Sequence, residues 1–106
     1  AASLQPESIF AQLSTTNTVP KAADQFASAL NIDPKVVRIR LKPGDCTVCS
    51  LASRPQVASM AGISIAEAEK LLEINDDVSF FIPHFSCTFL YDGETLTPRT
   101  CQMSPI

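Results

Sequence analysis

The stretch VVRIRLKPGDCTVCSLASRPQVASMAG, residues 36–62, holds most of the features that decide the fold. Apolar and basic side chains alternate at its start, which predicts a strand over residues 35–42 with one buried face and one basic, solvent-exposed face. Pro43-Gly44-Asp45 is typical of a turn, and a Cys-x-x-Cys motif at residues 46–49 follows it. The stretch ends at the centre of a predicted pair of helices, so strand, turn, cysteines and helices are close neighbours here.

Length and composition indicate one folded domain. The chain has 106 residues, of which 45% are hydrophobic and 18% charged, which is enough for a modest core. We expect a single globular domain over residues 1–106, with irregular termini at 1–4 and 102–106. The net charge of −3, without a block of like charges, does not favour binding to nucleic acid or to an anionic membrane. No apolar run approaches the ~18 residues of a membrane-spanning helix, so no membrane span is expected.

Helical and β patterns alternate along the rest of the chain. Capping residues and apolar spacing predict helices over residues 5–14, 18–30, 54–61 and 64–74, the last two joined at Gly62. Apolar and aromatic runs predict extended segments over residues 46–51, 78–82, 87–91 and 94–97. Asp92-Gly93 is a strong hairpin signal, and the tail from residue 98 is expected to be irregular. The predicted fold class is α+β: N-terminal helices, a central strand, a helical hairpin and a C-terminal β-hairpin.

Four cysteines, Cys46, Cys49, Cys87 and Cys101, make an even number in a short chain. This count is typical of a small secreted domain with two disulfides, for which three pairings are possible. We favour pairings in which Cys46 and Cys49 each bond to one of the other two, stapling the central segment to the C-terminal hairpin. The chain begins Ala1-Ala2-Ser3 without Met, as it would after removal of a signal peptide, so a secreted or extracytoplasmic location is expected.

The Cys46-Thr47-Val48-Cys49 motif also allows a redox interpretation. Two intervening residues let both sulfurs meet, so the pair could cycle between dithiol and disulfide. A strand, a Cys-x-x-Cys motif and a helix containing Pro55 follow one another over residues 36–60, and this order resembles the active-site region of thioredoxin-like proteins. The resemblance implies an extracytoplasmic thiol–disulfide protein with Cys46 and Cys49 as the redox pair and Pro83 facing them. We favour structural disulfides over this alternative.

Catalytic and metal-binding sites are not favoured by the remaining residues. Four cysteines and His84 supply enough ligands for zinc, but Cys87 and Cys101 lie fourteen residues apart and form no second paired motif. His84 could act as a general base beside Cys46 or Cys49, but no Gly-rich oxyanion turn accompanies it in the sequence. Outside the redox alternative, we therefore expect no metal, no cofactor and no enzymatic activity.

Residues 57–72, VASMAGISIAEAEKLL, resemble both a helix-turn-helix and a helix-hairpin-helix, two nucleic-acid-binding motifs. Both families need basic or amide-rich side chains facing the nucleic acid. The second helix instead carries Glu67, Glu69 and Glu73 against Lys70 alone, and acidic side chains repel phosphates. A helical hairpin packed on a sheet is the favoured interpretation, and nucleic-acid binding is a third and more distant hypothesis.

The C-terminal cysteines suggest where a binding surface lies. If they are bonded to the core, Tyr91–Thr100 becomes a constrained loop facing solvent, and such a loop loses little entropy on binding. The candidate binding residues in it are Tyr91, Asp92, Glu94 and Arg99. The alternative is that these residues form only the tip of a hairpin. We therefore predict a secreted, disulfide-stabilised recognition protein, of the effector, ligand or inhibitor type, that acts through contact with another protein.

Overall fold

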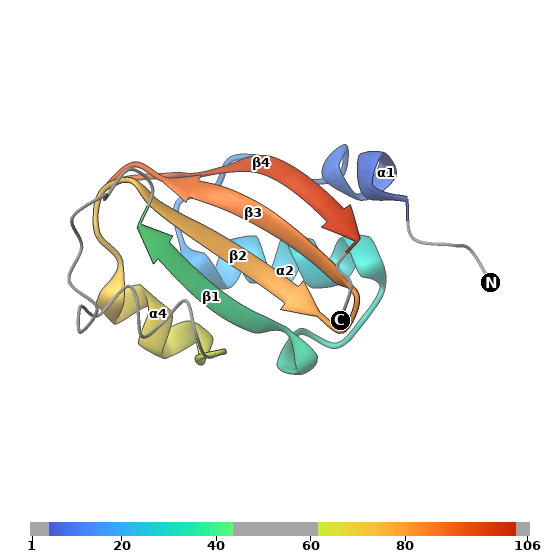
Figure 1. Cartoon of the computed structure of the whole chain (residues 1–106), viewed down its shortest axis with the longest axis horizontal. Coiled ribbons are helices and arrows are strands. Elements are labelled where there is room, and N and C mark those ends of the chain that lie inside the picture. The colour runs from blue at the N-terminus through green and yellow to red at the C-terminus, as the bar shows by residue number, and fades with distance from the viewer. Residues whose placement is uncertain (1–4, 44–61, 104–106) are drawn as a thin grey trace.

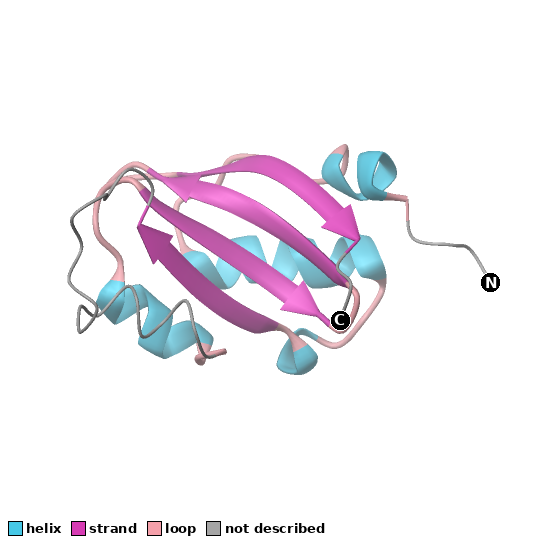
Figure 2. Cartoon of the chain, in the orientation of Figure 1, coloured by secondary structure: helices cyan, strands magenta, loops and turns pink. Residues whose placement is uncertain are grey.

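A four-stranded antiparallel sheet with one long helix across its back forms the body of the protein (Figures 1 and 2). The computed structural model describes residues 5–43 and 62–103. The helices are α1 (Pro6–Phe10), α2 (Val19–Leu30) and α4 (Ile65–Leu71), with a 3-10 turn, η1, at Pro34–Val36. The strands are β1 (Arg38–Pro43), β2 (Asp76–Ile82), β3 (Phe85–Tyr91) and β4 (Leu96–Met103), paired in sequence order. The predicted α+β class is confirmed for these residues.

Helix α2 follows its sequence signals closely. The Thr18 hydroxyl accepts a hydrogen bond from the Lys21 backbone N–H at 3.2 Å and so caps the first turn, in which Pro20 lies. Asn31 ends the helix in the left-handed conformation, with φ of 57°. The predicted helix over residues 18–30 is therefore confirmed. Its buried face consists of Val19, Ala22, Ala23, Phe26 and Ala27.

Strand β1 and helix α4 also follow the predicted patterns. Along and just before β1, Val37, Ile39 and Leu41 are buried, whereas Arg38, Arg40 and Lys42 are exposed. The Ser64 hydroxyl accepts a hydrogen bond from the Glu67 backbone N–H at 3.1 Å, which caps α4 as predicted. Helices α1 and α4 are shorter than the predicted 5–14 and 64–74.

The four strands form a meander joined in its second half by two tight turns. Ile82 pairs with Phe85, so Pro83 and His84 alone form the turn between β2 and β3. Proline fixes a negative φ and His84 has φ of 72°, which are the signs that a type II turn requires. This hairpin was not predicted. The predicted hairpin at Asp92-Gly93 is confirmed, since these residues connect β3 to β4.

The core lies between α2 and the inner face of the sheet, which we define as the face that carries Ile39, Leu41, Val78, Phe80, Phe85, Cys87, Phe89 and Leu96. All eight side chains have no measurable exposure. The Phe26 ring of α2 lies 6.2 Å from the rings of Phe80 and Phe85, and Phe80 meets Phe89 edge to face at 5.4 Å. Aromatic pairs at these separations add to the stabilisation from apolar burial.

Short segments cover part of each outer edge of the sheet. Thr16 exchanges two backbone hydrogen bonds with Leu96 at the start of β4, at 3.0 and 2.7 Å, and α1 packs beside the same strand. On the other side the Ile63 backbone N–H donates to the Ile39 carbonyl of β1 at 3.0 Å. Covered edges reduce uncontrolled strand pairing between molecules. None of the helices in the described part of the chain has the length and apolar character needed to cross a membrane.

One prediction about the course of the chain is corrected, and two fall on residues that the structure does not describe. The tail from residue 98 is not irregular as predicted, because residues 98–103 form most of β4. Pro98 is compatible with this strand because β4 lies at the sheet edge, where a missing N–H is tolerated. The predicted extended segment at 46–51 and helix at 54–61 lie outside the described residues.

Candidate functional site

One disulfide is present among the described residues, and it joins Cys87 to Cys101. The two residues lie directly opposite each other in β3 and β4, with Cα atoms 4.0 Å apart. The favoured pairing, in which Cys46 and Cys49 each bond to one of these two, is therefore wrong. The bond closes the C-terminal hairpin on itself, because the register of β3 and β4 brings its own two cysteines together. A disulfide indicates an oxidising, extracytoplasmic setting.

The thioredoxin-like interpretation loses part of its structural context. A redox Cys-x-x-Cys of that kind accompanies a βαβ unit, whose two strands are parallel. Here the strand that pairs with β1 is β2, and it runs antiparallel. Pro83, expected to face the dithiol, lies in the β2–β3 turn. Cys46 and Cys49 themselves lie outside the described residues, so their redox activity stays a prediction.

The four candidate binding residues of the C-terminal segment do not share one loop. Tyr91 is the last residue of β3, and its hydroxyl donates to the Gly93 carbonyl at 3.1 Å. Glu94 is exposed in the turn, whereas Arg99 lies within β4 and forms an ion pair with Asp77 of β2 at 3.2 Å. Instead of a constrained loop over Tyr91–Thr100, the structure has two strands and a short turn. A role of Tyr91, Asp92, Glu94 and Arg99 in binding stays a prediction.

Asp92 holds the turn between β3 and β4. Its carboxylate accepts hydrogen bonds from the backbone N–H groups of Thr95 and Glu94, at 2.8 and 2.9 Å, and from the Thr95 hydroxyl at 3.1 Å. These bonds, that from Thr95 foremost, lower the pKa of the Asp92 carboxyl because they favour its charged form. Gly93 has φ of +100°, a backbone conformation that would be strained for any residue with a side chain. Asp92 therefore has a clear structural role in this turn.

The sheet face opposite α2 is chemically different from the core, and we call it the outer face. No described helix lies across it in Figure 1. Strand pairing sets Arg40, Ser79, Thr88 and Thr100 in one row and Arg38, Phe81, Ser86 and Gln102 in the next. A third row holds Lys42, Asp77, Leu90 and Thr97, with Arg99 bonded to Asp77. None of these side chains is fully buried, so the described face is polar and accessible.

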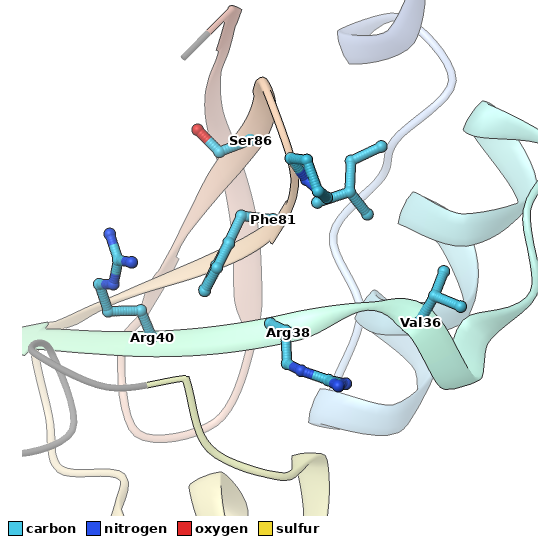
Figure 3. Close-up of a pocket in the computed structure, with 7 residues that line it drawn as sticks. Val36, Arg38, Arg40, Phe81 and Ser86 are labelled. Atoms are coloured by element: carbon cyan, nitrogen blue, oxygen red, sulfur yellow. The ribbon is translucent and has the colours of Figure 1, made fainter. Parts of the chain in front are cut away.

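A hollow of about 550 Å³ lies at the end of this face near the β2–β3 turn. We call it the Arg40 hollow (Figure 3); it is lined by Val36, Arg38, Arg40, Phe81, Ile82, Pro83 and Ser86. The Arg40 guanidinium carbon lies 4.5 Å from the centre of the Phe81 ring, a cation–π contact. In Figure 3 the side chains of Arg40 and Phe81 lie on one side of β1, and the side chain of Arg38 extends to the other side. The hollow thus combines a guanidinium, an aromatic ring and an apolar wall.

Charge is unevenly distributed over the protein. The whole chain carries a net charge of −3, yet the part of the outer face that the structure describes carries Arg38, Arg40, Lys42 and Arg99 against one acid, Asp77. Asp77 is already paired with Arg99. Among the residues that the structure describes, no carboxylate pairs with the three basic side chains of β1. A local positive patch of this kind attracts anionic groups at short range.

The other sequence candidates do not assemble into a site within the described ranges. His84 occupies the β2–β3 turn, exposed and at positive φ. Over residues 5–43 and 62–103, no three His, Cys, Asp or Glu side chains gather in a way that could hold a metal ion. Glu67 and Glu69 are exposed on α4, as the sequence pattern indicates.

The basic face of β1 is evident from the sequence, but its aromatic and hydroxyl neighbours are not. Phe81 and Ser86 were assigned only to apolar or unassigned segments, and Val36 to the start of a strand. The β1–β2–β3 register places Phe81 and Ser86 in one row with Arg38, next to the row of Arg40, and Val36 lies just before β1. Pro83-His84 lacks the glycine or asparagine typical of two-residue hairpins, so no local sequence signal indicated this row.

Comparisons of the chain with protein-family models, with curated proteins and with solved structures found no match.

Proposed function

We propose that the protein is a secreted recognition domain that binds another protein through the outer face of its sheet. The observation that carries this proposal is the contrast between an acidic chain and a described outer face on which three basic side chains lack an acidic partner. Charged surfaces of this kind accelerate encounter with a partner of opposite sign and fix its orientation. The charge of the outer face thus supports a role in binding another protein.

The rigidity of the face adds support. The strands that present these side chains are anchored by a fully buried inner face, and a disulfide ties β3 to β4. A surface fixed before binding loses less conformational entropy when a partner docks. The Cys87–Cys101 bond also fits the extracytoplasmic location that we propose together with prior removal of a signal peptide.

A second candidate function is favoured by the disulfide pairing. Because Cys87 and Cys101 bond to each other, neither is available to Cys46 or Cys49. Those two cysteines, outside the described residues, are left to each other, as a thiol–disulfide function would require. Mass spectrometry of the unreduced digest before and after mild dithiothreitol tests this candidate. Selective, reversible opening of a Cys46–Cys49 bond would favour it, and two thiols that never pair would exclude it.

The test of the leading proposal is capture followed by reconstitution. The native domain is immobilised and used to capture proteins from the extracellular fluid of the organism that produces it. Each captured protein is purified, and its binding to the domain is measured by isothermal titration calorimetry. We expect a stoichiometric complex that Arg38→Ser/Lys42→Ser weakens. The matched control, Lys21→Ser/Lys70→Ser, removes the same charge from α2 and α4, away from this face, and should bind as the parent does. If no protein forms a stoichiometric complex, the proposal is wrong.

A further inference from the structure

The Arg40 hollow offers two kinds of contact within one ligand's reach. The Arg40 guanidinium carbon lies over the Phe81 ring, 4.5 Å from its centre, and the Arg40 side chain is exposed. The guanidinium fork matches the two oxygens of a carboxylate, and contact with an aromatic ring restricts where the guanidinium can point. Arg40 is exposed, and no carboxylate in the described part of the chain occupies this position. An acidic group from outside the chain can therefore bind here without displacing an internal ion pair.

The walls of the hollow are mainly apolar. Val36 is 52% exposed, which is high for a valine, and Ile82, Pro83 and Phe81 line the same space. An apolar side chain that enters would cover this surface and gain the free energy of removing it from water. At about 550 Å³ the hollow falls within the size range of ordinary ligand pockets.

The same features favour a peptide over a nucleic acid. Proteins that bind single strands use a positively charged groove with several aromatic side chains on which successive bases stack. The described outer face presents one aromatic ring, Phe81, and Arg40 already lies over it. The acidic remainder of the chain would also repel a long polyanion. A short peptide with few charges avoids that repulsion.

We propose that the Arg40 hollow binds an acidic segment of the partner protein in which an Asp or Glu lies next to an apolar side chain. The carboxylate bonds to Arg40, with Arg38 adding positive potential, and the apolar side chain lies against Val36, Ile82 and Pro83. This inference rests on the proposed function, because it assigns the partner's chemistry at the same face.

The experiment titrates three capped pentapeptides into isotopically labelled protein and follows its NMR spectrum. Gly-Asp-Leu-Glu-Gly is the probe, Gly-Asn-Leu-Gln-Gly lacks its charges, and Gly-Asp-Ser-Glu-Gly lacks its apolar side chain. We expect shifts of the Val36 methyl, Arg40 side-chain and Ser86 amide signals with the probe, and binding at least about tenfold weaker with either control peptide. Equal binding of all three peptides, or shifts elsewhere, would overturn the inference.

Variants separate the hollow from the rest of the surface. Arg40→Ser should weaken the probe about tenfold or more, and Val36→Ser should weaken it without changing any charge. Lys70→Ser, on α4, is the matched control and should leave binding unchanged. A pentauridylate that binds as tightly as the probe would overturn the inference in favour of a general anion surface. Shifts at these residues on concentrating the protein alone would overturn it in favour of a second copy of the chain.

Failure of the acidic-segment inference can be distinguished from failure of the proposed protein binding. A reconstituted protein complex that tolerates Arg40→Ser would overturn the acidic-segment inference and leave protein binding in place. The absence of any stoichiometric complex would remove the proposed function, whatever the peptides do.

Discussion

Phe80 and Phe81 are neighbours in β2, yet they lie on opposite faces of the sheet and in opposite surroundings. Phe80 is fully buried, 5.4 Å from Phe89 and 6.2 Å from Phe26. Phe81 is half-buried under the exposed guanidinium of Arg40. Side chains in a strand alternate between faces, so one residue along the chain separates core from surface. One sheet thus concentrates its apolar packing on the inner face and leaves polar side chains accessible on the outer face.

The interactions on the two faces differ in strength as well. The inner face holds the aromatic cluster and the disulfide, whereas the outer face holds a hydroxyl pair and an ion pair. Ser79 and Thr88 hydroxyls lie 3.0 Å apart, and Arg99 meets Asp77 at 3.2 Å. Partly exposed contacts of this kind each contribute little to folding free energy. The outer face can therefore be substituted for binding tests without unfolding the protein.

The largest expected effect separates the two phenylalanines. Phe80→Ala should lower the free energy of unfolding by about 3–5 kcal/mol, because it leaves a cavity among fully buried rings. Phe81→Ala, its matched control on the outer face, should cost about 1 kcal/mol or less. Urea unfolding followed by circular dichroism measures both. Equal losses would show that the outer face is part of a core and would break the comparison.

The second-largest effect is expected from removing the disulfide of the inner face, compared with removing the hydroxyl pair of the outer face. Cys87→Ala/Cys101→Ala should cost about 2–4 kcal/mol, because the bond constrains the unfolded chain and its sulfurs fill part of the core. The control, Ser79→Ala/Thr88→Ala, removes the hydroxyl pair from the outer face and should cost about 1 kcal/mol or less. Midpoints of urea unfolding give both values. A double cysteine variant as stable as the parent would contradict the structure.

The sequence predicts best where signals are local. The Thr18 cap, the Asn31 end of α2, the alternation along β1 and the Asp92-Gly93 turn are each determined by a few neighbouring residues. The β2–β3 turn was missed because Pro83-His84 lacks the glycine or asparagine typical of two-residue hairpins. The length of β4 was underestimated because most of its residues are polar. An edge strand buries little apolar surface, so it lacks the apolar pattern by which strands are recognised.

Features that depend on register could not be predicted in the same way. The Cys87–Cys101 bond requires that the two cysteines face each other, and the register of β3 and β4 shifts next to Thr88 and Phe89. Sequence spacing does not reveal such a shift. The Arg40 hollow likewise combines side chains from β1, β2 and β3. The basic face of β1 was visible in the sequence, but its neighbours became known only from strand pairing.

A smaller effect is expected from the ion pair of the outer face. Arg99→Ala should lower the free energy of unfolding by at most about 1 kcal/mol, because Arg99 is 53% exposed and water screens the pair. The difference should shrink in 1 M NaCl, where charges are screened over a few Å. Thermal unfolding at low and high salt measures this. A loss above 2 kcal/mol that salt does not reduce would mean that the outer face contributes to folding as the inner face does.

The smallest effect belongs to Asp92, in the turn that belongs to neither face. Hydrogen bonds from Thr95 and Glu94 lower the pKa of its carboxyl in the folded protein, so the charged form contributes stability above the unfolded-state value of about 4. That contribution is lost as the pH falls through the lower folded-state pKa. Asp92→Asn should therefore melt below the parent at pH 6, and the gap should close toward pH 2. A carbon-13 NMR titration should give the Asp92 carboxyl a pKa below 3.8, the ordinary value for aspartate. A difference in melting temperature that persists unchanged at pH 2, or an Asp92 carboxyl whose pKa lies above 3.8, would show that the charge of this carboxylate does not stabilise the turn.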